Sequence, residues 1–141
     1  MSDPEIVFDD HPPEDWIERV GGGVDRHNIA FTGIAEWHLV RIFLKSTDGD
    51  CVGGLLGSIW GDWLEVDSLW VDEAWRGRGY ATQLLAEAER FATQKGCSAA
   101  TLDTHNPDAL RLYQKLGYEV FGVLDDYPPG WNKSYLRKRF A

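Results

Sequence analysis

The segment Arg76-Gly77-Arg78-Gly79-Tyr80-Ala81 combines glycines and arginines at the start of a helical pattern. No Ser, Thr or Asp side chain is placed to cap that helix, so its free N–H groups need another partner. Glycine lets the backbone approach a diphosphate, while the helix dipole and the guanidinium groups add positive potential. The segment therefore predicts an anion-binding loop. It lacks the Gly-Lys-Ser/Thr ending of a P-loop and the third glycine of a dinucleotide fingerprint, and a Gly-rich loop with solvated arginines is the alternative.

Two further side chains could move protons near such a site. Tyr113 lies on a predicted helix, and its phenol, with an ordinary pKa of about 10, is a possible proton donor. Glu65 lies on a predicted strand, and a carboxylate there can serve as a base. Strict alternation puts Glu65 on one strand face together with Trp63, Asp67, Leu69 and Val71. A core tyrosine and a solvated glutamate are the structural alternatives.

Other candidates for chemistry are weaker. His105, two residues after Asp103, is an alternative base or a loop residue. No pair of histidines has metal-ligand spacing, so no metal is expected. Cys51 and Cys97 are too few and too far apart for a disulfide scaffold, a zinc site or a redox pair. Both are expected to be reduced, packed thiols, and neither is a good nucleophile.

Hydrophobic periodicity predicts the elements that must position these groups. Alternating β-branched and aromatic residues, separated by turn signals, predict an antiparallel meander at 37–45, 51–60 and 63–71. A helical period and the stop residue Gly96 predict a helix at 77–95, and Asn106-Pro107 begins a second helix that ends at Gly117. Buried or alternating segments predict further strands at 98–104, 118–123 and 133–140.

The first part of the chain has weaker signals. Residues 5–8 suggest another strand, and Pro12-Pro13 begins a short helix that Gly21 ends. The triplet Gly21-Gly22-Gly23 then predicts a flexible joint.

Composition limits the class of protein. With 141 residues, 43% of them apolar, the chain has the size of one domain, 1–141, with a single core. Its 14 Lys and Arg against 23 Asp and Glu give a net charge of −9, which disfavours nucleic acids and anionic membranes as partners. The acidic first twenty residues exclude a cationic targeting peptide, and no apolar run approaches the ~20 residues that span a bilayer. A soluble, cytoplasmic protein is expected.

Three motifs in the right order resemble the GNAT superfamily of acetyl-CoA-dependent N-acetyltransferases. The family's loop reads Arg/Gln-x-x-Gly-x-Gly/Ala, and Arg76, Gly79 and Ala81 match every fixed position. The strand 65–71 upstream and the series Asn106-x-x-Ala109-x-x-Leu112-Tyr113-x-x-Leu116-Gly117-Tyr118 downstream also match. The resemblance covers residues 63–122, whereas residues 1–36 give no specific match.

The resemblance implies a fold and a set of site residues. The fold would be an α/β GNAT fold with a mixed, mainly antiparallel seven-stranded sheet, splayed between strands four and five, and helices on both faces. Tyr113 would protonate the departing thiolate, Glu65 would act as base, and the Val71 N–H would polarise the thioester carbonyl. The residues implied to bind acetyl-CoA are Leu69, Trp70, Val71, Arg76, Gly77, Arg78, Gly79, Tyr80, Ala81, Thr82 and Asn106.

The implied reaction is direct acetyl transfer from acetyl-CoA to a primary amine in a ternary complex. Acidic surface and aromatic residues favour a small cationic acceptor through long-range attraction and cation–π contact. The aromatic residues are Trp37, Trp60, Trp63, Tyr127 and Trp131, some of which could instead belong to the core or to a homodimer interface. Two alternatives are a non-catalytic module that binds or senses acyl-CoA and an enzyme that acetylates a protein or peptide amine. A toxin that acetylates tRNA fits the fold but not the charge.

Overall fold

The computed structural model describes residues 2–140. Residue contacts group the chain into two compact units, residues 1–35 and residues 36–141, and each is described by itself. The expectation of one domain over 1–141 stays a prediction.

The first unit contains the helix α1 (Glu14–Thr32), none of whose residues is buried. The predicted stop at Gly21 and the joint at Gly21–Gly23 are wrong, because α1 continues through these glycines. A glycine inside a helix costs about 1 kcal/mol relative to alanine but does not forbid helical backbone. The helix ends instead at Gly33, where φ is 75° and the N–H donates to the Ile29 carbonyl oxygen at 2.7 Å. Residues 5–8 are not in a strand.

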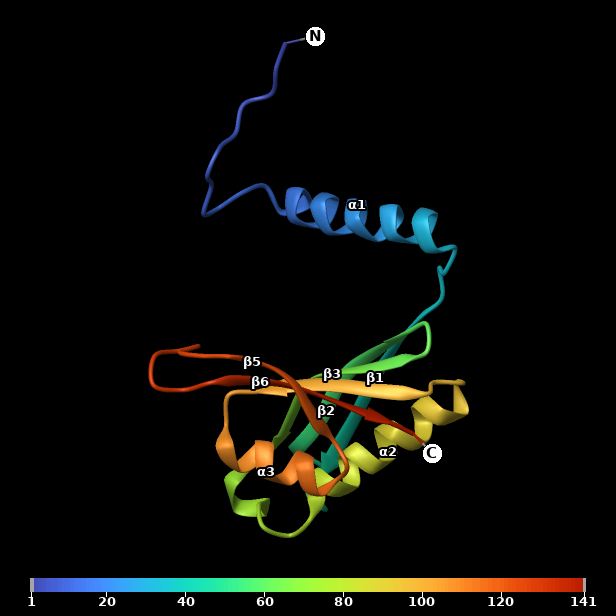
Figure 1. Cartoon of the computed structure of the whole chain (residues 1–141), viewed down its shortest axis with the longest axis vertical. Coiled ribbons are helices and arrows are strands. Elements are labelled where there is room, and N and C mark those ends of the chain that lie inside the picture. The colour runs from blue at the N-terminus through green and yellow to red at the C-terminus, as the bar shows by residue number, and fades with distance from the viewer. Residues whose placement is uncertain (1, 141) are drawn as a thin grey trace. The chain divides into compact units, whose positions relative to one another are not determined.

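The second unit is built on a six-stranded sheet in the order β1-β2-β3-β4-β6-β5 (Figure 1). The strands are β1 (Trp37–Lys45), β2 (Cys51–Trp60), β3 (Trp63–Val71), β4 (Ala99–Thr104), β5 (Glu119–Leu124) and β6 (Lys133–Arg139). Among the strands that residues 2–140 form, only β3 and β4 pair in parallel. The sheet is therefore mixed, as predicted, but the expected seven strands are six because residues 5–8 pair with nothing in the described chain.

β3 and β4 separate after a short parallel contact. Their pairs are Trp63 with Ala99, Leu64 with Ala100 and Glu65 with Thr101. Beyond Glu65, β3 follows β2 as far as Val71, while β4 follows β6. Among residues 2–140, the β3 edge at 66–71 that faces β4 therefore has no strand partner. This opening lies between the two segments for which the sequence predicted it.

Two helices cover one face of the sheet. These are α2 (Tyr80–Gln94), preceded by the short 3₁₀ helix η1 (Glu73–Trp75), and α3 (Pro107–Lys115). Leu85 of α2 and Tyr113 of α3 belong to a single core with Leu64 of β3, and Figure 1 shows both helices on the same side of the strands. Both helices of the second unit therefore lie on the same face of its sheet, and the expectation of helices on both faces stays a prediction.

A β-bulge in β3 changes which residues share a face. Gly57 of β2 pairs with Val66, whereas Leu56 pairs with Ser68, so Asp67 is an extra residue. An extra residue reverses the alternation on either side of it. Leu69 and Val71 consequently pack into the core with Leu64 and Val66. The predicted common face of Glu65, Leu69 and Val71 is wrong, since Glu65 lies on the opposite, exposed face.

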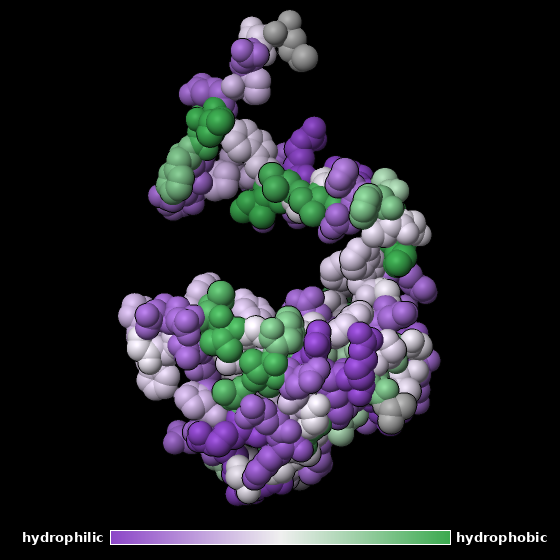
Figure 2. Space-filling view, in the orientation of Figure 1, coloured by the Kyte–Doolittle hydropathy of each residue, from purple (hydrophilic) through white to green (hydrophobic). Residues whose placement is uncertain are grey.

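The exposed residues are both polar and apolar. Hydrophilic residues dominate the side shown in Figure 2, and apolar residues are exposed in both units. None of the helices formed by residues 2–140 has the length and apolar character needed to cross a membrane.

Candidate active site

α2 begins without a side-chain cap. Its N-cap is Gly79, at φ 82°, and no side chain accepts a hydrogen bond there. Gly77 is also left-handed, at φ 75°, so both positions need glycine. A Cβ added at either glycine would meet no atom within 4 Å, which leaves open space beside the first turn. Helix N–H groups that face open space at the positive end of the dipole suit an anion. The predicted helix at 77–95 begins only at Tyr80, because the left-handed glycines precede it.

A cavity of about 380 Å³ lies against this loop. The end of β3 and the loop contribute Val71, Arg76, Gly77, Gly79, Tyr80, Ala81 and Thr82 to its lining. The opposite wall comes from α3 through Asp108, Ala109 and Leu112. The fold therefore brings most of the residues predicted to bind a cofactor to one cavity, together with one side of α3.

The two arginines of the loop have different surroundings. Arg76 donates from Nε to the carbonyl oxygen of Val71 at 2.8 Å, so its side chain turns back over the strand end. The Arg78 guanidinium carbon lies 5.3 Å from the centroid of the Trp75 ring, and it is not part of the cavity lining. Both guanidinium groups add positive charge beside the uncapped helix.

Two lining residues escaped the sequence analysis. Trp75 lines the cavity from η1, and its ring meets Tyr80 edge-to-face with centroids 6.3 Å apart. Asp108 places a carboxylate in the cavity wall, where an ion pair with Arg111 compensates its charge. The sequence signal for Asp108 was only that of an acidic first turn, and Trp75 had no signal beyond its position one residue before Arg76.

The other residues predicted to bind the cofactor lie around this cavity. Val71 is 8% exposed and lines it, whereas Leu69 is half-buried in the core and Trp70 is 51% exposed. Leu69, Trp70 and Val71 all belong to the unpaired edge of β3, and a chain that carries amides could pair with such an edge as an added strand.

Asn106 caps α3, as predicted. Its Oδ1 accepts from the backbone N–H groups of Asp108, at 2.8 Å, and Ala109, at 3.4 Å. The side chain lines a neighbouring cavity of about 320 Å³ with His105 and Trp131, not the cavity beside the loop. Its contribution to cofactor binding stays a prediction.

Tyr113 is a buried phenol on α3, 7% exposed. Its ring packs against Tyr118 with centroids 6.2 Å apart and planes at 58°. Burial raises the pKa of Tyr113, and the negative charge of Asp103 raises it further. The hydroxyl is therefore protonated at neutral pH, which is the state a proton donor needs. Tyr113 is not among the lining residues, whereas Ala109 and Leu112 of the same helix are.

Glu65 occupies the point where the strands separate. It is the last residue of β3 that pairs with β4, and its side chain is exposed on the sheet face opposite the core that contains Tyr113. The two groups predicted to move protons thus lie on opposite faces of the sheet.

His105 follows the end of β4 and is separated from Glu65 along that strand. Thr101, the partner of Glu65, lies four residues earlier, which corresponds to about 13 Å of extended chain. The His105 Nδ1 lies 2.6 Å from the Tyr127 carbonyl oxygen. A carbonyl only accepts, so Nδ1 donates and Nε2 is left as the basic nitrogen. His105 and Glu65 are therefore separate candidates for the base, at different positions along β4.

The cysteines differ in exposure. Cys97 is buried, and burial together with the charge of Asp62 raises the pKa of its thiol, which disfavours a thiolate nucleophile. Cys51 is exposed, so the expectation of a packed thiol is wrong there, because its side chain lies at the first position of a strand beside a turn. Residues 2–140 contain no group of His, Cys, Asp and Glu that could hold a metal ion.

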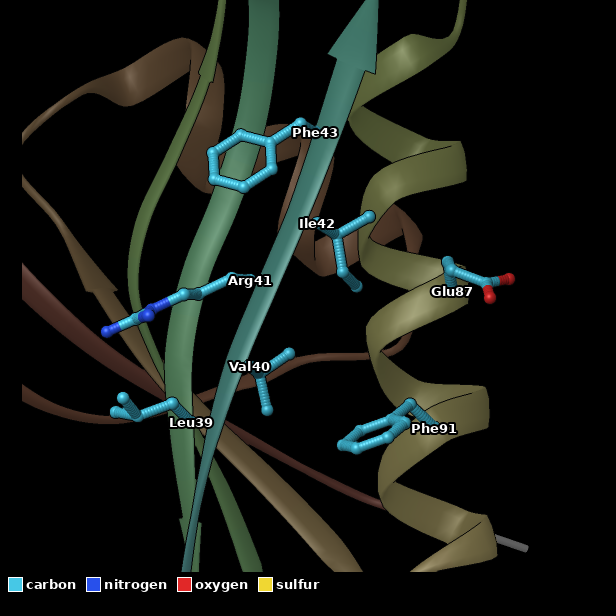
Figure 3. A pocket seen from close by; sticks show the side chains of 7 residues that line it. All are labelled: Leu39, Val40, Arg41, Ile42, Phe43, Glu87 and Phe91. Atoms are coloured by element: carbon cyan, nitrogen blue, oxygen red, sulfur yellow. The ribbon is translucent and has the colours of Figure 1, made fainter.

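A second cavity, of about 470 Å³, lies between β1 and α2. In Figure 3, Val40 and Ile42 point towards the helix and Phe91 points towards the strand. Glu87 also lines this cavity and turns outward. None of the predicted site residues lines it, so it is not a candidate for the same chemistry.

Comparison with known proteins gives consistent matches. The model of the acetyltransferase (GNAT) family matches residues 7–118. An acetyltransferase of Agrobacterium fabrum is 40% identical over 114 residues, which cover 81% of this chain and 83% of that protein. A blasticidin-S acetyltransferase of Streptomyces morookaense is 40% identical over 91 residues, 64% of this chain and 67% of that protein. A crystal structure from Agrobacterium tumefaciens, described as an acetyltransferase, has a TM-score of 0.92 at 35% identity and covers 97% of this chain and 100% of its own.

Proposed function

Since this chain belongs to the acetyltransferase (GNAT) family, we propose that it transfers the acetyl group of acetyl-CoA to a primary amine of a small, cationic acceptor. Transfer occurs by direct attack in a ternary complex. Membership of the family makes the chain an acyl-CoA N-acyltransferase.

One observation carries this function. Seven of the residues predicted to bind acetyl-CoA line a single cavity at the uncapped start of α2, namely Val71, Arg76, Gly77, Gly79, Tyr80, Ala81 and Thr82. The left-handed glycines and the space beside them suit a diphosphate. The unpaired edge of β3 supplies main-chain groups for the pantetheine amides. These residues fit acetyl-CoA, which supplies the acetyl thioester when bound.

The chain's own groups then perform three tasks. The Val71 N–H polarises the thioester carbonyl, because an N–H aimed at that oxygen stabilises developing negative charge. Tyr113, protonated at neutral pH, gives its proton to the leaving sulfur. Glu65, on the other face of the sheet, takes a proton from the ammonium group of the acceptor, directly or through water, so that the neutral amine can attack the thioester carbonyl carbon.

The acceptor is drawn in by charge and by exposed aromatic rings. The net charge of −9 attracts cations over long range. Trp131, in the loop between β5 and β6, is 54% exposed and can contact a cationic ligand. Trp63 and Tyr127 are less suited, because Arg139 lies 5.3 Å from the centroid of the Trp63 ring and Lys133 lies 5.1 Å from that of Tyr127. The similarity to a blasticidin-S acetyltransferase supports a small-molecule amine over a peptide.

A module that binds acyl-CoA without turnover is the second candidate. An amine, antibiotic and peptide library incubated with isotopically labelled acetyl-CoA separates the two, with products identified by mass spectrometry and thiol release followed in parallel. We expect labelled small cationic amines and matching thiol release. A rise in melting temperature with CoA, without thiol release on any amine, would instead establish the binding module. Labelled peptides alone would replace the small acceptor with a protein amine.

A further inference from the structure

Glu89, Tyr118 and Lys138 form a polar cluster that the proposed mechanism does not use. The Tyr118 hydroxyl donates to Glu89 Oε2 at 2.9 Å, and Lys138 Nζ donates to Glu89 Oε1 at 2.7 Å. Tyr118 is 3% exposed, and the side chains of Glu89 and Lys138 are 17% and 26% exposed. Removing such charged groups from water is costly. The cluster joins α2 and β6 to Tyr118, which lies in the short link between α3 and β5.

Tyr118 also contacts Tyr113, through a backbone hydrogen bond and through its ring. The Tyr118 N–H donates to the Tyr113 carbonyl oxygen at 3.0 Å, and the Gly117 N–H donates to the Gln114 carbonyl oxygen at 3.2 Å. With Gly117 at φ 96°, these bonds form a Schellman ending of α3. Such an ending brings the side chains at its first and last positions together. Here those side chains are the packed rings of Tyr113 and Tyr118.

Lys138 covers the same turn. Its Nζ lies 5.5 Å from the centroid of the Tyr118 ring. A Cβ added at Gly117 would lie 3.3 Å from Lys138 Cε, so the lysine stem runs directly over the glycine. The end of α3 is therefore held by its own backbone turn, by the Glu89 carboxylate and by the Lys138 side chain.

We infer that Tyr118, held by Glu89 and Lys138, is a positioning residue that fixes the Tyr113 hydroxyl for proton transfer, which rests on the proposed function. α3 has nine residues, and a helix this short is not stable alone. The last turn, which carries Tyr113, therefore takes its position from tertiary contacts. A reacting group displaced by about 1 Å can lose roughly 10²-fold in rate, so the cluster matters for turnover more than for cofactor binding.

The charged groups around the two phenols are few. Asp103 of β4 acts on Tyr113, and Glu89 of α2 and Lys138 of β6 contact Tyr118. The two phenols also face one another. Changing the Tyr118–Glu89 bond should therefore move the alkaline limb of the pH–kcat profile, which reports the Tyr113 proton.

The first test is Tyr118→Phe, which keeps the ring contact and removes the donor to Glu89. We expect kcat to fall about tenfold, within the roughly 10²-fold range for mispositioning, while KM for acetyl-CoA changes less than about twofold. The alkaline limb should shift as well. A normal kcat and an unmoved pH profile in the folded variant would overturn the inference.

The decisive comparison repeats Tyr118→Phe in a Tyr113→Phe background. Once the positioned hydroxyl is absent, loss of its support should leave kcat unchanged. An equal fold-loss in both backgrounds would mean that Tyr118 acts through general stability, which contradicts positioning. If Tyr113→Phe alone keeps full turnover, the proton-donor assignment and the positioning role both fail. If only the Tyr118 variants keep turnover, the donor assignment survives and positioning alone fails.

Variants of two glutamates on α2, Glu89 and Glu87, test the inference even if the Tyr118→Phe variant does not fold. Glu89→Gln can still accept from Tyr118 but loses the ionic contact with Lys138, so kcat should fall less than in Glu89→Leu, which removes both contacts. Glu87→Gln is the control, because Glu87 pairs with Arg90 outside the cluster. Equal kcat values for all three variants would overturn the inference.

Discussion

Arg76 donates its Nε–H to the carbonyl oxygen of Val71 at 2.8 Å. The bond ties the last residue of β3 to the loop that precedes α2. It therefore keeps the unpaired strand edge and the uncapped helix at a constant separation, with both residues lining the same cavity. A ligand that contacts the strand edge and the helix N-terminus together depends on that separation.

Arg76→Lys should weaken binding of CoA while keeping the charge. A lysine ammonium is not the planar donor that reaches the Val71 oxygen. Loss of a hydrogen bond from a charged group costs about 1.5–3 kcal/mol. Because this bond is already present without ligand, only part of that cost affects binding, and we expect Kd to rise by at most roughly 100-fold. Isothermal titration calorimetry measures the change. Arg90→Lys, in an exposed ion pair with Glu87, serves as control, and equal Kd values for the two variants would exclude the structural role of Arg76.

Gly79→Asp should abolish CoA binding without unfolding the protein. The substitution puts a carboxylate at the N-terminus of α2, where a diphosphate would lie, and adds backbone strain at φ 82°. Gly61→Asp is the matched control, since Gly61 has φ 63° and open space around it in the turn between β2 and β3. Calorimetry should show binding only for the control. Retained CoA affinity in folded Gly79→Asp would remove the binding loop from residues 76–82.

Glu65→Gln should depress turnover most at low pH, where little of the amine is unprotonated. The amide cannot accept the proton that the carboxylate takes at the opening between β3 and β4. The pH profile of kcat/KM is the measurement, with Glu119→Gln, a carboxylate paired with Arg137, as control. Superimposable profiles for wild type and Glu65→Gln would leave Glu65 as a surface carboxylate and favour His105 or water.

Tyr113→Phe should lower turnover by roughly 10²–10⁴, the contribution of one positioned general acid. The ring that packs against Tyr118 is kept, so stability should barely change. Affinity for acetyl-CoA should also stay nearly constant, because the hydroxyl matters mainly in the transition state. Single-turnover kinetics isolate the chemical step, and Tyr135→Phe, which alters a β6 tyrosine that packs against Phe121, is the control. Wild-type single-turnover rates in Tyr113→Phe would refute the assignment.

Stability should fall at alkaline pH because of the buried phenols. Folding raises the pKa of both Tyr113 and Tyr118 above 10.0. The unfolded chain therefore loses these protons first, so stability is complete below about pH 10 and decreases as pH rises towards the folded pKa. Each phenol adds a slope of roughly 1.4 kcal/mol per pH unit in that window. Urea unfolding above about pH 10 should show a smaller slope for Tyr113→Phe, and an unchanged slope would mean that Tyr113 titrates normally.

Local chemistry made much of the second unit predictable. Asn106 offers a side-chain oxygen to the N–H groups that follow it, and Gly117 adopts the left-handed conformation that ends a helix. Signals of this kind act within a few residues, so the sequence contains them in full. The same signals failed at Gly21–Gly23, because a glycine permits a helix to stop without requiring it.

The sequence by itself determined the order of strands and helices in the second unit and the uncapped glycine loop before α2. The tertiary structure decided which groups meet. The bulge at Asp67 arises from the register between β2 and β3. Only the pairing of these strands therefore shows that Glu65 and Val71 lie on opposite faces of β3. The cluster of Glu89, Tyr118 and Lys138 joins residues up to 49 positions apart. Hydrogen bonds over that separation depend on how elements pack, and alternation or helical period along one segment carries no information about it.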